Sequence, residues 1–223
     1  MNPDRQVAAD ESIALTEPGP QFVSRGGMKL VAALDAFAVD PSGRRAVDIG
    51  ASTGGFTDCL LQRGAEEVVA IDVGHGQLDW RLRNDPRVDV RERTNARLLE
   101  AEAFGSPASL CVADVSFISL RTLASAMLAI TTDDADFVLL VKPQFEAGRD
   151  RVGKGGIVRD PEIRLAVLQE VVRGLDAEGI GVVAAIASPI TGADGNVEYL
   201  VHGRRDTRSI TDEALAAVVE QGP

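Results

Sequence analysis

The sequence predicts an α/β fold: a seven-stranded, mostly parallel sheet with helices on both faces and a terminal antiparallel hairpin. Three observations lead to this prediction. Short apolar segments alternate with amphipathic segments along most of the 223 residues. A glycine-rich turn joins the first apolar segment to a helical one, and the last two apolar segments have no helix between them. Strands that alternate with helices form parallel sheets, because each crossover returns the chain to the same edge.

A helix is predicted over residues 28–37, ahead of the first strand. Apolar side chains recur there at helical spacing and make one continuous face. Lys29 falls in the first turn of this helix, where the helix dipole does not favour a cation. Its position therefore needs another explanation.

The stretch from Val47 to Phe56, VDIGASTGGF, predicts a strand, a glycine turn and the start of a helix. Ligands of open α/β sheets bind at the carboxyl ends of strands, where glycines let the backbone approach them. The glycine spacing does not match the G-x-G-x-x-G pattern of dinucleotide sites, and no Lys-Ser/Thr follows as in a P-loop. S-adenosylmethionine (SAM), which has a ribose and an adenine but no phosphate, fits this loop. The alternative is a purely structural turn.

The remaining elements follow in alternation. Strands are predicted at residues 46–49, 67–72, 87–91, 109–115, 135–141, 180–188 and 196–202. Further helices are predicted at residues 55–63, 78–83, 96–101, 120–130, 161–178 and 211–220. Seven strands that end in a hairpin are the Rossmann-like layout of the SAM-methyltransferase fold.

Composition and length indicate one main domain. With 45% hydrophobic residues the chain can bury one core. Residues 1–20 have the composition of a linker, so we place the domain at 21–223. No apolar run approaches the ~20 residues that span a bilayer, and the N-terminus lacks the features of a signal peptide. We therefore expect a cytoplasmic protein without a membrane partner.

Metal and disulfide chemistry are not indicated. Cys59 and Cys111 lie in apolar segments without C-x-x-C spacing, so we expect both thiols in the core. His75 and His202 are the only histidines, which leaves few ligands for a metal site. Trp80 is expected in the core as well, and the alternative is an exposed Trp80 that stacks on a base.

The net charge of −11 argues against a nucleic-acid partner, but its distribution weakens that argument. Arginines crowd residues 81–97, and four cations fall within residues 149–159. Each cluster is equally compatible with a basic patch and with an ordinary solvated face. The loop 144–159 is a candidate lid or RNA contact, or else a surface connection.

Charged and polar residues follow the predicted strands at the edge where the ligand site is expected. They are Asp48, Asp72, Asn95, Asp114 and Lys142. Glu198 lies in the last strand among apolar neighbours. A single lysine at a strand end is usually a surface residue whose stem packs on apolar groups. Lys29, Asp114, Lys142 and Glu198 together suggest a shared site.

Several ordered motifs carry a family resemblance. They are SRGGMKL, DIGASTGGFTDCLL, AIDVGHGQLDWRLRNDPRV, ERTNAR, ADVSFISL, VKPQFEAGR, GKGGIVRD and SPITGADGNVEYL. From about Phe22 to about His202 the chain resembles the TlyA family, hemolysin-named proteins similar to the FtsJ/RrmJ ribose 2′-O-methyltransferases. The resemblance implies a SAM-dependent enzyme that methylates ribose 2′-hydroxyls of ribosomal RNA on cytidine, with ribosomal RNA or ribosomal subunits as its partner. It also implies a catalytic tetrad of Lys29, Asp114, Lys142 and Glu198.

The chemistry of ribose methylation agrees with these residues. The enzyme must align a weak hydroxyl nucleophile with a sulfonium methyl group and accept one proton. Lys142 is the expected acceptor, because a desolvated ammonium can release its proton and a guanidinium cannot. Asp114 and Glu198 are expected to orient the lysines and the ribose. The expected SAM contacts are Asp48, Gly50, Ser52, Gly54, Asp72, Asn95 and Asp114.

TlyA proteins carry an N-terminal S4 RNA-binding domain, of which Val7 to Leu15 resembles only the last strand. Residues 1–20 are therefore interpreted as a linker or remnant of such a domain. Three alternatives stay open: a hemolysin-like membrane-active protein, a catalytically silent RNA- or ribosome-binding protein, and a dehydrogenase with a Rossmann fold. The glycine spacing disfavours the last.

Overall fold

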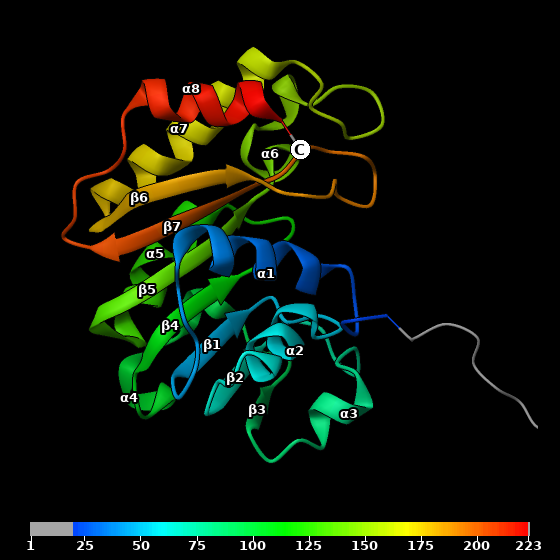
Figure 1. Ribbon diagram of the computed structural model, residues 1–223, viewed down its shortest axis with the longest axis vertical. Coiled ribbons are helices and arrows are strands. Elements are labelled where there is room, and N and C mark those ends of the chain that lie inside the picture. The colour runs from blue at the N-terminus through cyan, green and yellow to red at the C-terminus, as the bar shows by residue number, and fades with distance from the viewer. Residues whose placement is uncertain (1–19, 223) are drawn as a thin grey trace, which may run out of the picture.

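The computed structural model describes residues 20–222, and the predicted S4-like strand at 7–15 lies outside them. Seven strands form one sheet in the order β3-β2-β1-β4-β5-β7-β6 (Figure 1). They are β1 (Arg45–Ile49), β2 (Glu67–Ile71), β3 (Val88–Arg91), β4 (Ala108–Ala113), β5 (Thr131–Val141), β6 (Ile180–Ala187) and β7 (Tyr199–Arg205). The strands from β3 to β5 are parallel, whereas β7 is antiparallel to both β5 and β6. The predicted fold class and terminal hairpin are confirmed.

Helices cover both faces of the sheet (Figure 1). They are α1 (Gly26–Phe37), α2 (Gly55–Gln62), α3 (Trp80–Arg83), α4 (Ala101–Phe104), α5 (Ala124–Ala129), α6 (Pro143–Glu146), α7 (Pro161–Ala177) and α8 (Asp212–Gln221). Three short 3₁₀ turns, η1 (Ala96–Leu98), η2 (Leu120–Leu123) and η3 (Arg149–Arg151), complete the elements. None of the helices within residues 20–222 is long and apolar enough to cross a membrane.

Two apolar cores lie on opposite faces, because successive side chains of a strand point to opposite sides. On one face α1 and α2 pack against alternate residues of the central strands, including Ala46 and Val68. On the other, η2, α5, α7 and α8 pack against their neighbours, including Val47 and Val69. Cys59 and Cys111 are fully buried, as predicted. The strand ends between these two layers are thereby held rigidly.

Several predicted boundaries are wrong. The helix predicted at 96–101 is split into η1 and α4, and the one at 120–130 consists of η2 followed by α5. The last strand begins at Tyr199 rather than Asn196, whose side chain bonds a neighbouring loop. The prediction for Trp80 is also wrong, because 72% of the residue is exposed. α3 has only four residues and turns Leu82, not Trp80, toward the core.

Candidate active site

The glycine turn after β1 brings the backbone of two strands into close approach. Gly50 has a φ of 85°, and a Cβ at this position would lie 2.6 Å from the backbone oxygen of Asp114. Only glycine fits both the left-handed conformation and the narrow gap. The turn therefore places Gly50 directly beside the residue that follows β4.

A cavity of about 290 Å³ opens at this edge of the sheet. Five of the predicted SAM contacts line it: Gly50, Ser52, Asp72, Asn95 and Asp114. The Asp72 carboxylate accepts the backbone N–H of Ser52 at 2.8 Å and that of Gly74 at 2.6 Å. These bonds fix the carboxylate at the end of β2, where its remaining lone pairs can accept hydroxyl groups of a ligand.

Two predicted SAM contacts, Asp48 and Gly54, do not line this cavity. Gly54 has a φ of 98° and lies against Leu82, where a Cβ would be 2.2 Å from Cδ1. The absence of a side chain at Gly54 therefore allows the start of α2 to pack against Leu82 of α3. Asp48 is fully buried, and its Oδ2 accepts the Thr57 hydroxyl at 2.7 Å. Burial raises the pKa of the Asp48 carboxyl to about 7, and its Oδ1 has no hydrogen-bond partner among residues 20–222.

A second cavity of about 180 Å³ adjoins the first. Lys29, Asp114 and Lys142 all line it, although they come from α1 and from the ends of β4 and β5. The Lys142 ammonium lies 2.5 Å from the Asp114 carboxylate and donates to the Ser116 hydroxyl at 3.1 Å. The strand ends thus converge as expected for parallel strands.

Glu198 pairs with the other lysine. Its Oε2 lies 2.5 Å from the Lys29 ammonium, and the two residues are only 2% and 8% exposed. The amide nitrogen of Gln144 donates to Glu198 Oε1 at 3.4 Å. Gly192 packs so closely that a Cβ there would lie 2.6 Å from the same oxygen. The buried pair explains why a lysine lies in the first turn of α1, a position the helix dipole does not favour.

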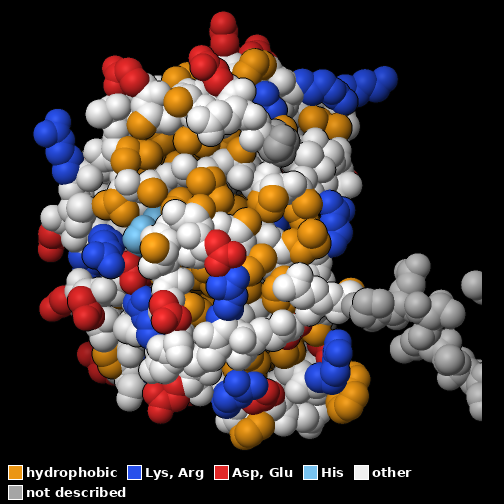
Figure 2. Space-filling model, viewed as in Figure 1, with side chains coloured by type: hydrophobic (Ala, Val, Ile, Leu, Met, Phe, Trp, Pro, Cys, Tyr) orange, Lys and Arg blue, Asp and Glu red, His pale blue; other side chains and the backbone are white. Residues whose placement is uncertain are grey.

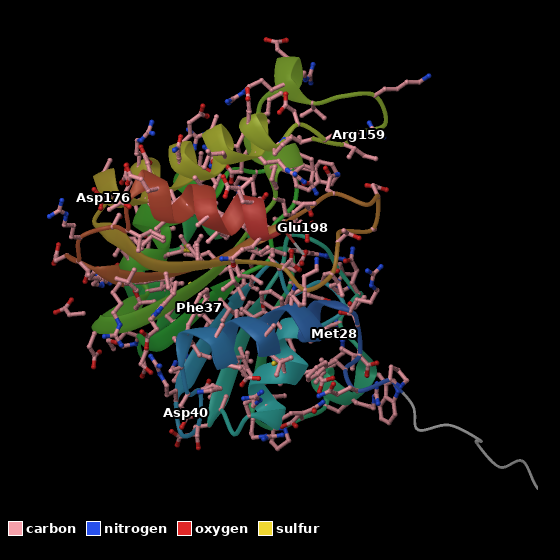
Figure 3. The ribbon with its side chains drawn as sticks, turned by 45° about the horizontal axis from the view of Figure 1, so that its top comes forward. Met28, Phe37, Asp40, Arg159, Asp176 and Glu198 are labelled. Carbon is pink, nitrogen blue, oxygen red and sulfur yellow. The ribbon has the colours of Figure 1, made fainter. Side chains whose placement is uncertain are left out.

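The two cavities share four lining residues: Gly50, Ser52, Asp114 and Ser116. A molecule in the larger cavity would therefore face a molecule in the smaller one across Asp114. Figure 3 shows Met28 and Glu198 on the same side of the molecule, with Phe37 farther along α1. The four residues of the predicted tetrad thus form two ion pairs at a single edge of the sheet.

Phe117, which no sequence pattern indicated as a site residue, lines the larger cavity at its rim. It is 90% exposed and has a left-handed φ of 65°, and its ring lies 4.8 Å from that of Phe145. Bulky residues adopt such backbone angles only where the surroundings hold them, often at ligand sites. Exposure and backbone strain appear only in the tertiary structure.

Glu146 is a second residue that no sequence pattern indicated, and it hydrogen-bonds the segment that lines the larger cavity. Its carboxylate, 6% exposed, accepts the Ser119 hydroxyl at 2.6 Å and the Leu120 N–H at 2.8 Å. Burial raises the pKa of this carboxyl. The contact ties the segment after β4 to helix α6, which directly follows Lys142.

His75 is exposed, and its Nδ1 lies 2.8 Å from Oε2 of Glu92. Hydrogen bonds from Gly76, Arg83 and His75 lower the pKa of Glu92 to about 2. Within residues 20–222 no group of three or more His, Cys, Asp or Glu side chains could hold a metal ion.

Comparisons with known proteins agree with this architecture. The profile of the FtsJ-like methyltransferases matches residues 22–205. The chain is 53% identical over 214 residues to the 16S/23S rRNA (cytidine-2′-O)-methyltransferase TlyA of Mycobacterium tuberculosis H37Rv, covering 95% of this chain and 78% of the relative. It is 30% identical over 203 residues to the 23S rRNA (cytidine-2′-O)-methyltransferase TlyA of Campylobacter jejuni, covering 91% and 78%. A hemolysin-named structure from Streptococcus thermophilus superposes with a TM-score of 0.88 at 43% identity, covering 92% and 75%.

Proposed function

We propose that this chain, which belongs to the FtsJ-like methyltransferase family, transfers the methyl group of SAM to the 2′-hydroxyl of a cytidine ribose in ribosomal RNA. The observation that carries the proposal is the pair of cavities that meet at Asp114. One has the strand-end acid and glycine turn suited to a nucleoside ligand. The other holds the lysines and carboxylates suited to deprotonating a hydroxyl.

The larger cavity is the proposed SAM site. Bound there, SAM would supply an electrophilic methyl group. Asp72 would accept the ribose hydroxyls of SAM, the backbone of Gly50 and Ser52 would contact the ligand, and Asn95 would contact the adenine; all four residues line the cavity. The charged Asp72 side chain is already fixed by two backbone N–H groups, so little of its freedom is lost on binding. Asp48 is fully buried and lines neither cavity, so we assign it no direct contact with SAM.

The smaller cavity is the proposed acceptor site. The Lys142 ammonium first releases a proton to solvent, and the resulting amine then accepts the proton of the 2′-hydroxyl, while Asp114 orients the lysine from 2.5 Å. The Lys29–Glu198 pair is nearly fully buried, so its charges are fixed in place and can orient the ribose. Proton transfer by a positioned side chain contributes on the order of 10²–10⁴ in rate, and alignment of the two reactants contributes further.

Phe117 provides a surface for the base that carries the reacting ribose. Bases of single-stranded or flipped nucleotides stack on aromatic side chains, whose exposure is otherwise unfavourable. The ring stands at the rim of the cavity that shares Asp114 and Ser116 with the acceptor site. An exposed aromatic residue there supports a nucleotide substrate.

Two other functions are less well supported. The hemolysin name of the Streptococcus thermophilus relative suggests membrane activity, but no helix among residues 20–222 is suited to span a bilayer. A silent RNA-binding protein would have no need of the buried Lys29–Glu198 pair, and burying two charges costs free energy of desolvation. Leakage of liposomes caused by the purified protein would favour the first, and RNA binding without methyl transfer would favour the second.

The deciding experiment is transfer of tritiated methyl groups from SAM to ribosomal subunits. Subunits from cells that lack the corresponding modification are incubated with the purified chain, and the labelled nucleotide is mapped. Incorporation at the 2′-oxygen of a cytidine supports the proposal. Incorporation into a base, or none into either subunit while SAM is bound, would overturn it.

A further inference from the structure

We propose that residues 148–159, called here the basic loop, bind the phosphate backbone of the substrate RNA, and that Asn196 positions this loop beside the catalytic residues. The inference rests on the proposed function, since it assigns the acceptor RNA to a surface of the same site. It goes further by separating the cations that contact RNA from those that do not.

The basic loop carries four cations and one acid in a protein whose net charge is −11. Arg149, Lys154 and Arg159 are exposed, and none of them pairs with a carboxylate among residues 20–222. The fourth cation, Arg151, pairs with Glu170 of α7 at 2.7 Å. Three positive charges are thus left without an internal counterion.

The other arginine-rich stretch differs in this respect. Four of its arginines each pair with a nearby carboxylate: Arg81 with Asp79, Arg83 with Glu92, Arg87 with Asp85 and Arg91 with Asp89. A cation that already has a carboxylate partner gains less from a phosphate, because the existing pair must be broken. Of the six arginines at 81–97, four are paired and two, Arg93 and Arg97, are not, whereas three of the four cations of the basic loop have no carboxylate partner among residues 20–222.

Asn196 holds the basic loop in one conformation. Its side chain is 1% exposed, its Nδ2 donates to the Gly156 carbonyl at 2.9 Å, and its Oδ1 accepts the Val158 N–H at 3.0 Å. The backbone carbonyl of Asn196 accepts the Gly192 N–H at 2.9 Å, in the connection that leads to β7. A single buried amide therefore clasps the loop to the segment that carries Glu198.

The other end of the loop is anchored by Arg151. Both of its terminal nitrogens bond Glu170, at 2.7 and 2.8 Å, and its Nε donates to the Ala147 carbonyl at 2.7 Å. Lys154 lies between the two anchors, in a turn closed by a bond from Gly153 N–H to the Ile157 carbonyl. Because the loop is held at both ends, its charges are ordered before RNA arrives.

The loop is connected to the catalytic residues at both ends. It follows Lys142 through the single turn of α6, and Asn196 is two residues before Glu198. Figure 3 shows Arg159 and Glu198 on the same side of the molecule. In the space-filling view of Figure 2, lysine and arginine side chains project from the upper right of the molecule. Phosphate contacts fix the register of a nucleic acid without reading its sequence. Cations at this place would set which ribose reaches Lys142.

The first test removes the charges. Arg149→Ala, Lys154→Ala and Arg159→Ala are combined in the full chain, and binding to an unmodified 23S or 16S rRNA transcript is measured between 50 and 300 mM KCl. Each lost phosphate contact lowers the salt slope by about 0.7–0.9, so we expect a decrease of about 2–3 and a weaker Kd by at least tenfold. The matched control is Arg81→Ala combined with Arg87→Ala, two exposed arginines with carboxylate partners, for which we expect an unchanged slope.

The second test removes the hydrogen bonds of Asn196 to the basic loop and keeps every charge of the loop. Asn196→Ala should raise the KM for the rRNA transcript about as much as the triple variant does, with a much smaller effect on kcat and an unchanged Kd for SAM. Asn196→Asp keeps the acceptor for Val158 and loses the donor to Gly156. Its KM for the rRNA transcript should therefore lie between those of the wild type and Asn196→Ala. Cleavage by trypsin at Lys154 should become faster in Asn196→Ala.

The outcomes are distinguishable. A triple variant with the salt slope and KM of the wild type overturns this inference and leaves the proposed function standing, provided that the wild type transfers methyl groups. Equal losses in the paired-arginine control would also overturn it. A wild type that binds the transcript but transfers no methyl group from SAM overturns the proposed function instead. Loss of SAM affinity in Asn196→Ala would assign Asn196 to the general stability of the site.

Discussion

The Lys142 ammonium lies 2.5 Å from the Asp114 carboxylate, at the point where the two cavities meet. Lys142 directly follows β5 and Asp114 directly follows β4, so the neighbouring parallel strands bring the two residues together. Asp114 therefore lines both the proposed SAM site and the proposed acceptor site. Substitutions at this pair are the most informative ones for the proposed reaction.

Replacement of Lys142 separates chemistry from cofactor binding. Lys142→Ala should lower methyl transfer by at least 10²-fold, because the variant lacks the proposed proton acceptor, while the Kd for SAM stays near that of the wild type. Lys142→Arg should fail similarly, since guanidinium does not release a proton. Tritiated-methyl transfer and calorimetry with SAM measure the two quantities. Wild-type turnover in either variant would contradict the assignment.

Asp72 should matter for the cofactor alone. Asp72→Ala removes a fixed carboxylate from the larger cavity and should weaken SAM binding by about 10–100-fold, or roughly 1.4–2.8 kcal/mol. The KM for RNA should change little. Ser52→Ala is the control, because Ser52 reaches Asp72 through its backbone N–H, which the substitution keeps. Unchanged SAM affinity in Asp72→Ala would move the ribose contact elsewhere.

Gly50→Ala should disrupt the site through the backbone. The new Cβ would lie 2.6 Å from the Asp114 carbonyl at a φ of 85°, so we expect a loss of about 1–3 kcal/mol in the free energy of unfolding together with weaker SAM binding. Gly43→Ala is the matched control, because Gly43 has a φ of 68° and open space around it. Urea denaturation of both variants isolates the steric clash from the backbone strain. Equal losses would mean that the clash contributes nothing.

The buried Asp48 predicts a pH dependence of stability. Its pKa is about 7 in the folded protein against an ordinary value near 3.8, so the native state keeps a proton that the unfolded state releases. The free energy of unfolding should therefore fall as the pH rises from about 4 to about 7, and this contribution should be constant above that range. At about 1.4 kcal/mol per pKa unit the effect amounts to several kcal/mol.

Asp48→Asn tests this pH dependence, because its amide oxygen can still accept the Thr57 hydroxyl. Urea denaturation of the SAM-free protein at pH 5, 6, 7 and 8 should give a shallower decline for the variant than for the wild type. Parallel declines would show that other groups cause the dependence.

Phe117 should contribute to the RNA step and not to folding. Since 90% of the residue is exposed, Phe117→Ala should leave the unfolding midpoint unchanged, because alanine keeps the same backbone strain at the positive φ. The kcat/KM of methyl transfer should fall by a factor that corresponds to about 1–3 kcal/mol, the range for loss of one stacked base. Phe117→Tyr, which keeps the ring, should restore activity. Failure of that rescue would argue against stacking.

The sequence by itself determined the order of strands and helices, because alternating apolar and amphipathic segments are local patterns that only a parallel sheet can bury. It also determined which residues follow the strands, and hence that Asp72, Asp114 and Lys142 would lie at one edge. The element boundaries were less accurate, as at Asn196, since side-chain bonds to distant loops decide where a strand stops.

The tertiary structure alone decided which charges meet. Lys29 and Glu198 are 169 residues apart, and their pairing depends on how α1 packs beside β7. Two arginine-rich stretches differ because carboxylates pair with most arginines of one, whereas Asn196 holds the other in place with three of its cations unpaired among residues 20–222. Trp80 and Phe117 are exposed although both are large and apolar. Residue type sets what a side chain can do, whereas its partners are set by contacts between segments that local periodicity does not encode.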